Sequence, residues 1–335
     1  MTKSAFTGIG IATATGAQLI PKVAFGWLPQ SWNTLVDRIA DIVTALFLCA
    51  VTYVAWTFVD SSRDIGMLTS GGISIEAWKI QAAIPAVAEA LNPNNWLNAA
   101  QGILTTDTRP KGASVQLDYA GHTITINGIS KGAGMIMPNM ATMLGFIGTD
   151  AKLSQNLVSS LVKEFSDLSF NRITIDGDTS TNDSCMLLAS GCSHAPEITE
   201  DHEDYPKFKG ALRRIFVQLA QAIVRDGEGA TKFVSVIVEQ AKDVEEALGV
   251  AYTIAHSPLI KTALFASDPN WGRILAALGR APIESLDLGL VEIFLGEVRI
   301  VQAGEKCSEY TEARGQMVMD RDEISIRLCL GRGNI

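Results

Sequence analysis

The sequence has 335 residues, which is enough for one large α/β domain or for two domains of ordinary size. Its 27 basic and 36 acidic residues leave a formal net charge of −9, and no basic run is long enough to follow a phosphate backbone. The composition therefore argues against nucleic acid as a partner.

The cysteines indicate the redox compartment. All five are scattered, form no CxxC pair and, apart from Cys192 and His194, lie far from any histidine in the sequence. An odd and dispersed set is typical of reduced thiols, and not of a disulfide framework or a zinc site. We therefore expect a cytoplasmic protein with no metal site.

The N-terminal part contains one long uncharged stretch. Residues 42–59 run for eighteen positions without a charge between Asp41 and Asp60, which is long enough for a marginal transmembrane helix. Interrupting threonines and many β-branched and aromatic residues suit a buried strand, so we expect core structure there in preference to a membrane span. A secretory signal is not evident, because no charged segment leads directly into an apolar core and a small-residue cleavage site.

The next segments predict a helix and a hairpin. Residues 75–91 have the periodicity of an amphipathic helix, which the Asn-Pro-Asn-Asn sequence at 92–95 would end. Residues 114–119 and 123–127 alternate between apolar and polar side chains on either side of Ala120, Gly121 and His122, which is typical of a β-hairpin. The loop that carries Thr142 follows this hairpin, so we expect a rigid sheet to present it.

The second half of the chain alternates between predicted strands and helices. Helices are expected at 153–165, 243–255 and 271–278, and apolar residues at helical spacing over 208–223 predict a further helix with one face in the core. Strands are expected at 172–175, 232–238, 259–265, 291–301 and 324–330. This alternation predicts an α/β fold, and the hairpin makes its sheets mixed.

Thr142 is a candidate nucleophile. It directly follows the small residue Ala141 in a glycine-bearing, mostly uncharged loop at 131–144. If the backbone holds the Ala141 carbonyl against the Thr142 hydroxyl, an N-to-O acyl shift and hydrolysis would cut the chain there. The new α-amino group, with a reference pKa of about 8, could then act as the base for its own hydroxyl. From the residues alone, a helix cap or a packed loop residue is the more common role of such a threonine.

Other polar segments lie at the ends of predicted elements, where loops commonly carry function. They occupy residues 105–111, 176–183, 225–232 and 268–273. Taken singly, these segments do not indicate a particular function, because Glu228 could cap a turn with Lys232. Likewise Lys131, in the loop that carries Thr142, could be a solvated lysine. The glycines at 132 and 134 lack the continuation of a phosphate-binding loop and Rossmann spacing.

Taken together and in order, these segments resemble the ornithine acetyltransferase / glutamate N-acetyltransferase family of arginine biosynthesis. The resemblance covers roughly residues 75–331. It depends on six blocks: Thr-Thr-Asp-Thr-Arg-Pro-Lys at 105–111, Lys-Gly-Ala-Gly-Met-Ile at 131–136 with Pro-Asn-Met-Ala-Thr-Met-Leu at 138–144, Phe-Asn-Arg-Ile-Thr-Ile-Asp-Gly-Asp-Thr-Ser-Thr-Asn-Asp at 170–183, Arg-Asp-Gly-Glu-Gly-Ala-Thr-Lys at 225–232, Ser-Pro-Leu-Ile-Lys-Thr at 257–262 and Asp-Pro-Asn-Trp-Gly-Arg at 268–273.

The resemblance implies a self-cleaving acetyltransferase with an N-terminal-nucleophile-like α/β architecture, cut between Ala141 and Thr142. Thr142 would take acetyl from N-acetylornithine as an acetyl-threonine and pass it to glutamate. By position in the motifs, Lys131 would meet the substrate α-carboxylate, Thr105 would supply a hydroxyl contact, and Glu228 would receive the ornithine side-chain amine. No metal or organic cofactor is needed. Bifunctional members also use acetyl-CoA, which leaves open acetyl-CoA as a co-substrate here.

The same resemblance implies an organisation of the chain. Residues 67–141 would be the rest of an α-chain-like part, 142–335 a β-chain-like part beginning at the nucleophile, and the cleaved chains would form a homo-oligomer. Residues 1–66 are atypical, because they lack the family's Asn-Ser-Gly-Asn-Ala-Asn type segment and the Ser-Thr-Gly element that lines its oxyanion hole. Family members also continue beyond residue 331 into a segment that contributes an asparagine and a hydroxyl to the substrate, whereas this sequence ends at Ile335.

These departures keep two other functions open beside the active transferase. One is an inactive or impaired, truncated relative that remains a single uncut chain. The other is an N-terminal-nucleophile amidase or aminopeptidase, which would pass the acyl group to water.

Overall fold

The computed structural model describes residues 88–89, 91–92, 94–137, 143–179 and 183–335. The chain divides into two compact units, Met1–Asn92 and Pro93–Ile335, and every strand below belongs to the second. The uncharged stretch at 42–59, most of the helix predicted at 75–91, and the predicted cleavage site Ala141 and Thr142 lie outside the described residues. Within the described ranges, no helix has the length and hydropathy that a membrane span requires.

The first sheet contains the predicted hairpin. Its strands are β1 (Lys111–Tyr119), β2 (His122–Lys131), β3 (Leu144–Thr149) and β4 (Ser184–Ala189), in that order, with β1, β2 and β3 antiparallel and β4 parallel to β3. Tyr119 pairs with His122, and the two residues between them, Ala120 and Gly121, both have positive φ, 52° and 77°. Positive φ at both central positions is the geometry of the tight turns that hairpins favour. The hairpin prediction is confirmed.

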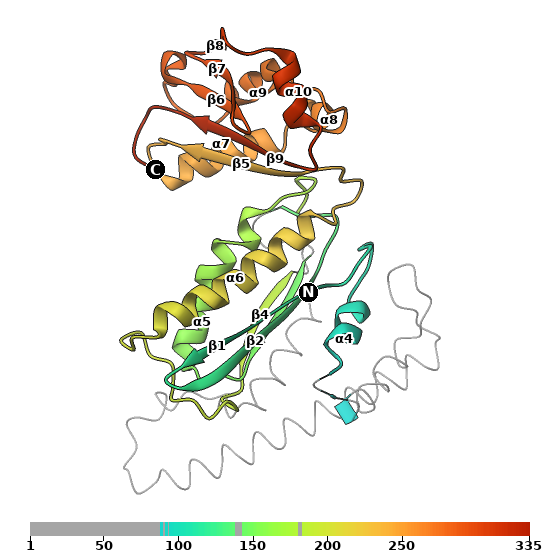
Figure 1. Cartoon of the computed structure of the whole chain (residues 1–335), viewed down its shortest axis with the longest axis vertical. Coiled ribbons are helices and arrows are strands. Elements are labelled where there is room, and N and C mark those ends of the chain that lie inside the picture. Colours follow the sequence, from blue (N-terminus) through green and yellow to red (C-terminus); the bar gives the residue numbers. More distant parts are fainter. Residues whose placement is uncertain (1–87, 90, 93, 138–142, 180–182) are drawn as a thin grey trace, which may run out of the picture. The chain divides into compact units, whose positions relative to one another are not determined.

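Helices cover both faces of this sheet (Figure 1). On one face α6 (Tyr205–Val224) packs so closely against β2 that a Cβ added at Gly128 would lie 2.7 Å from Leu219. On that face too, α5 (Gln155–Asp167) places Phe165 against Phe216. The opposite face meets α4 (Trp96–Gly102), whose Trp96 lies over Gly148. The helices predicted at 153–165 and 208–223 are confirmed, and the apolar stripe of α6 lies in the core.

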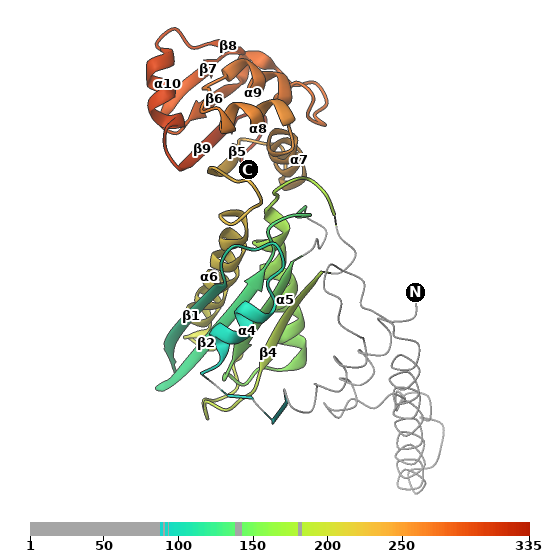
Figure 2. The same ribbon diagram turned by 90° about the vertical axis from the view of Figure 1, so that its right-hand side faces the viewer.

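The second sheet has the order β5-β9-β6-β7-β8. Its strands are β5 (Phe233–Glu239), β9 (Glu323–Cys329), β6 (Glu292–Leu295), β7 (Val298–Gln302) and β8 (Glu305–Lys306), and only β5 and β9 are parallel to each other. Figure 2 shows α7 (Val244–Ala255), α8 (Pro258–Phe265) and α9 (Trp271–Leu278) together on one side, and α10 (Glu312–Met319) follows β8. Two short 3-10 helices, η3 (Phe170–Arg172) and η4 (Leu288–Leu290), complete the described elements. The mixed α/β class is confirmed.

Three of the predicted strands are wrong in part or in full. Residues 259–265 form α8, because Pro258 occupies its first turn, where the missing N–H of proline costs nothing. Residues 172–175 form no strand, since both the Thr174 hydroxyl and the Ile175 N–H donate to the carbonyl of Ile136 at 2.9 Å. The stretch 291–301 is a hairpin of two strands that turns at Gly296, whose φ is 56°.

Candidate active site

The candidate site is built on the loop that follows β2 and contains residues 131–137, which we call the Lys131 loop. Lys131 is the last residue of β2, Thr105 lies in the segment between α4 and β1, and Glu228 lies in the turn after α6. These three predicted substrate-binding residues therefore come from separate parts of the second unit. The structure describes no atom of Ala141 or Thr142, so their roles stay predictions.

Lys131 is a buried cation. The residue is 7% exposed, and its ammonium makes no hydrogen bond or ion pair with any residue that the structure describes. Its charge does act on the nearby carboxylate of Asp183. An ammonium has three donors and is costly to bury without partners, so this position is suited to bind an anionic group of a ligand.

Glu228 lies against the same loop. A Cβ added at Gly134 would lie only 2.8 Å from Glu228 Oε1, so this carboxylate sits directly over the glycine. The Glu228 N–H also donates to the Ala133 carbonyl at 2.8 Å, which ties the turn after α6 to the Lys131 loop. Lys232, the alternative partner for Glu228, donates instead to the carbonyl of Arg321 at 3.3 Å. The loop thus carries the Lys131 cation and meets the Glu228 carboxylate.

Two other carboxylates hold the backbone of the loop. Asp107 Oδ1 accepts the Gly132 N–H at 2.7 Å. Asp176 accepts the Met135 N–H at 2.5 Å and the Ile136 N–H at 3.0 Å. Hydrogen bonds to ionised acceptors are short and strong, so this stretch of backbone has little freedom to shift.

A fourth carboxylate, that of Asp183, holds Met143, the residue that follows Thr142 in the sequence. Asp183 Oδ1 accepts the N–H of Met143 at 2.8 Å, while its Oδ2 is buried and has no hydrogen-bond partner among the described residues. Burial raises the pKa of Asp183 above its ordinary value, and the Met143 N–H and the Lys131 charge only partly oppose this. A cavity of about 30 Å³ lined in part by Asp183, Met143 and Cys185 adjoins it and could hold a water molecule.

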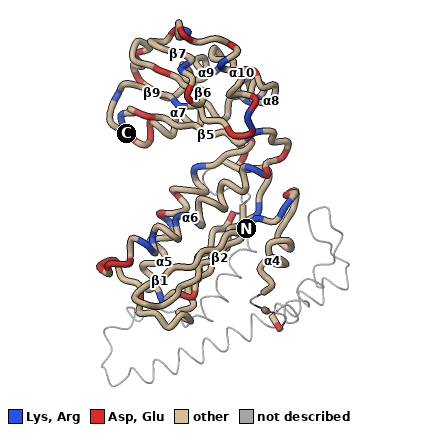
Figure 3. The backbone as a smooth tube through the Cα atoms, in the orientation of Figure 1, with Lys and Arg blue, Asp and Glu red and all other residues tan. Residues whose placement is uncertain are grey.

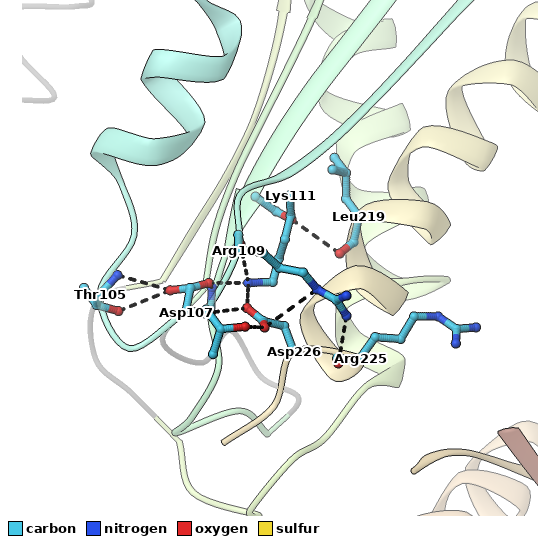
Figure 4. A network of polar contacts seen from close by, with 10 residues as sticks. Thr105, Asp107, Arg109, Lys111, Leu219, Arg225 and Asp226 are labelled. Atoms are coloured by element: carbon cyan, nitrogen blue, oxygen red, sulfur yellow. Dashed lines mark hydrogen bonds and ion pairs between the residues drawn. The ribbon is translucent and has the colours of Figure 1, made fainter. Parts of the chain in front are cut away.

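Behind the loop lies a buried ion network, drawn in Figure 4. The Lys111 ammonium lies 2.5 Å from Asp107 Oδ1 and 2.6 Å from Asp226 Oδ2, and the three side chains are 1%, 0% and 3% exposed. Thr105 donates its N–H to Asp107 Oδ2 at 3.2 Å and its hydroxyl to the same oxygen at 3.5 Å. Thr108 donates its N–H to Asp226 at 3.0 Å, and its hydroxyl donates to the other oxygen.

The network keeps both carboxylates ionised. Burial alone would raise the pKa of Asp107, but hydrogen bonds from Gly132, Lys111 and Thr105 outweigh it, and the pKa lies below its ordinary value. Burial likewise acts to raise the pKa of Asp226, and the hydrogen bonds from Lys111 and Thr108 reverse the direction. The Lys111 ammonium therefore serves two anions in the protein interior, and the exposed Arg109 guanidinium lies 3.8 Å from the Oδ1 of Asp226.

A larger cavity lies next to Glu228. It has a volume of about 770 Å³ and is lined mostly by apolar residues of β5, α6, α7 and α8, and Glu228 is among its lining residues. Among the described residues that line it, neither Lys131 nor Thr105 appears. In the same described part, no three His, Cys, Asp or Glu side chains are arranged to hold a metal ion. Figure 3 shows acidic and basic residues interspersed there, with no continuous basic run.

The sequence identifies the polar segments that contain Asp107, Lys111 and Asp226, but it does not predict that these residues form a buried ion network. Asp107 and Lys111 lie in one polar segment and Asp226 in another, but the contact between Lys111 and Asp226 joins positions 115 residues apart. The only local sign is an acidic residue four positions before a lysine, a spacing that is common on solvated helices as well.

Comparison with known proteins gives a consistent result. The model of the ArgJ family matches residues 52–335. Proteins named arginine biosynthesis bifunctional protein ArgJ are similar to this chain: that of Pseudomonas fluorescens is 55% identical over 280 residues, 83% of this chain and 69% of its own length, and that of Pseudomonas syringae pv. tomato is 56% identical over the same shares. The protein of that name from Methylococcus capsulatus is 55% identical over 255 residues, 76% of this chain and 62% of its own length.

A solved structure is similar as well. The crystal structure of the arginine biosynthesis bifunctional protein argJ from Bacillus halodurans superposes with a TM-score of 0.55 and 36% sequence identity. The match covers 58% of this chain and 90% of that chain. This chain thus spans roughly two thirds of the length of the three relatives above, and most of the length of the solved Bacillus halodurans chain.

Proposed function

Because the chain belongs to the ArgJ family, we propose that it transfers an acetyl group from N-acetylornithine to glutamate in arginine biosynthesis, through an acetyl-threonine at Thr142. One observation in the structure carries the substrate assignment. Lys131 is a buried residue whose ammonium has no partner among the described residues, and the Glu228 carboxylate lies against the same short loop, which suits a ligand with one anionic and one cationic group.

The proposed maturation cuts the chain at Thr142. The Thr142 hydroxyl oxygen attacks the carbonyl carbon of Ala141, the C–N bond breaks, and the former amide nitrogen takes up the hydroxyl proton. Water then hydrolyses the resulting ester, which restores the hydroxyl and releases the Ala141 carboxylate. Thr142 is left with a free α-amino group whose reference pKa, about 8, allows it to act as a base near neutral pH.

The proposed transfer has two half-reactions. In the first, the Thr142 α-amine accepts the hydroxyl proton while the oxygen attacks the acetyl carbonyl of N-acetylornithine; the amide C–N bond breaks and ornithine leaves with that proton. In the second, the α-amine of glutamate attacks the carbonyl carbon of the acetyl-threonine ester, the C–O bond to Thr142 breaks, and the threonine oxygen recovers the proton that the glutamate nitrogen loses. Each half-reaction releases its product before the next substrate reacts, which is ping-pong kinetics.

The proposed binding roles follow from charge. Lys131 pairs with the α-carboxylate that both substrates carry, and the Thr105 hydroxyl contacts the same end. Glu228 pairs with the side-chain ammonium of N-acetylornithine, which glutamate lacks. Glu228→Gln should therefore raise the KM for N-acetylornithine, by about tenfold for the loss of one charge-assisted hydrogen bond, and should leave the KM for glutamate nearly unchanged or lower.

Further parts of the proposal concern the whole enzyme. We place it in the cytoplasm, as a homo-oligomer of cleaved α and β chains that needs no metal or organic cofactor. Acetyl-CoA is proposed as a second acetyl donor, supported by the word bifunctional in the names of the relatives. Transfer from acetyl-CoA to glutamate by the purified protein tests this part separately.

Denaturing electrophoresis and a glutamate-dependence assay test the function against its alternatives. The proposal expects two fragments divided at Thr142, a single band for Thr142→Ala, and acetylglutamate formation that depends on both substrates. A single band for wild type that Thr142→Ala leaves unchanged would instead identify an uncleaved relative. Release of acetate at the same rate with and without glutamate would identify an amidase.

A further inference from the structure

Asp107 stands at the centre of the contacts between the proposed binding residues. Its side chain is 0% exposed, and both of its oxygens are used. Oδ1 accepts from the Gly132 N–H at 2.7 Å and from Lys111 at 2.5 Å. Oδ2 accepts both the N–H and the hydroxyl of Thr105. One buried carboxylate therefore links the Thr105 segment to β1 (Figure 4), and through the Gly132 N–H it also holds the end of β2.

The bond to Gly132 fixes the peptide that follows Lys131. The nitrogen of Gly132 belongs to the same planar unit as the Lys131 carbonyl, so holding its N–H sets the plane from which the Lys131 side chain departs. Gly132 has a φ of 148°, a conformation that few other residues adopt. Because glycine is free to adopt many other conformations, a hydrogen bond from another segment is needed to hold the bend after Lys131 in this one. Asp107 provides that support from outside the loop.

The bond to Thr105 fixes the direction of a hydroxyl. A threonine hydroxyl has one proton and two lone pairs, and here the proton is directed at Asp107 Oδ2. The lone pairs are then left to accept from a donor on a ligand. Thr105 is exposed, so its free side is accessible to such a ligand.

We infer that Asp107 is a positioning residue for substrate, which sets the Lys131 ammonium and the Thr105 hydroxyl in one geometry while Lys111, itself held by Asp226, pairs with its charge. The inference rests on the proposed function, because it needs Lys131 and Thr105 to bind the amino-acid part of the substrate. A purely structural network would stabilise the protein and would have no preference for one acetyl donor over another.

Two acetyl donors separate these cases. N-acetylornithine carries the α-carboxylate and ammonium that the site recognises, whereas p-nitrophenyl acetate offers the same acetyl group with neither charge. The measured quantity is the ratio of the kcat/KM values for acetylation of the enzyme by the two donors, together with KM and kcat for N-acetylornithine. A loss of folded protein lowers both values equally and leaves the ratio unchanged.

Asp107→Asn is the main variant, because it leaves the ion pair between Lys111 and Asp226 intact. We expect the ratio to fall about tenfold, mainly through a higher KM for N-acetylornithine, which is the effect of weakening charge-assisted hydrogen bonds that orient the substrate. Asp118→Asn is the matched control: it makes the same chemical change at an exposed position at the other end of β1, and the ratio should not move.

Asp226→Asn extends the test if Asp107→Asn does not fold. It keeps all contacts of Asp107 with Gly132 and Thr105 but weakens the hold of Asp226 on the Lys111 ammonium, which is then less firmly placed against Asp107. The ratio should therefore fall by a smaller factor, about threefold. If folded Asp107→Asn has the wild-type ratio within error, the inference is overturned and the proposed function is not. If Asp107→Asn does not fold, the same outcome in Asp226→Asn overturns the inference. A wild-type enzyme acetylated by p-nitrophenyl acetate and never by N-acetylornithine overturns the proposed function and the inference with it.

Discussion

Replacing Lys111 by methionine removes the only ammonium between Asp107 and Asp226 within the described structure while keeping much of the side-chain volume. The two carboxylate oxygens lie 2.5 Å and 2.6 Å from Lys111 Nζ, so they are no more than about 5 Å apart, and two like charges at that separation repel by about 3 kcal/mol at an effective dielectric constant of about 20. Removing one partner from a buried ion pair generally costs about 3–5 kcal/mol. We expect Lys111→Met to lose about that much free energy of unfolding at pH 7.

The pH dependence identifies the cause. Without the ammonium, the pKa of the carboxylate pair in the folded variant rises above its value in the unfolded chain, so the folded state takes up a proton more readily. The deficit of the variant relative to wild type should therefore shrink as the pH falls from 7 to 5, by up to about 1.4 kcal/mol per pH unit. Urea unfolding followed by far-UV circular dichroism measures it, because urea does not screen charges.

Lys152→Met is the control for this experiment. Lys152 also pairs with a carboxylate, Glu197, but at 3.5 Å and with side chains 60% and 42% exposed. Exposed pairs contribute about 0–1 kcal/mol, so this variant should lose little stability and show little dependence on pH. A Lys111→Met deficit below about 1 kcal/mol, or one of equal size at pH 7 and pH 5, would refute the reasoning.

Three further predictions follow from single contacts. Gly128→Ala should cost about 1–3 kcal/mol in urea unfolding, because its Cβ would lie 2.7 Å from Leu219, and an unchanged midpoint would contradict this packing. Asp226→Asn should reduce the loss of stability between pH 5 and pH 3. The pKa of Asp226 lies below 3.8, so the stability that its carboxylate contributes is complete above that pH and decreases as the pH falls through the folded-state pKa. A variant that loses stability in acid as steeply as wild type would count against this. Gly134→Ala should raise the KM for N-acetylornithine, because the added Cβ would lie 2.8 Å from Glu228 Oε1 and would displace this carboxylate. An unchanged KM would argue against a role of Glu228 in binding.

The fold was most predictable where the periodicity was long or the turn chemistry specific. The apolar positions of α6 recur at helical spacing, and all six that define the stripe, Phe208, Leu212, Ile215, Phe216, Leu219 and Ile223, are fully buried. The hairpin turns at Ala120 and Gly121, where glycine adopts positive φ at no cost. In both cases the local preference and the tertiary environment agree.

Short apolar runs were predicted less well. The seven residues from Leu259 to Phe265 have no clear alternation, and periodicity alone does not separate a strand from a short buried helix at that length. Pro258, at the first helical turn, was the available signal. For 172–175 no local signal existed, because Thr174 and Ile175 are held by the distant carbonyl of Ile136.

The family resemblance predicts the residues of the site, whereas their spacing in the sequence does not indicate that they belong to one site. Thr105, Lys131 and Glu228 are 26 or more residues from one another in the sequence, and their roles remain predictions. The structure adds Asp107, which contacts Thr105 directly and holds the residue after Lys131. Such a residue is invisible to local patterns, because its importance depends on which distant segments fold around it.

Intact-mass spectrometry of the freshly purified protein, before and after incubation with N-acetylornithine, tests the central claim most directly. We predict two fragments, one of which begins at Thr142, and a gain of one acetyl group on that fragment that glutamate removes. Wild-type protein with the bond between Ala141 and Thr142 intact, and no acetyl gained from N-acetylornithine, would contradict the account.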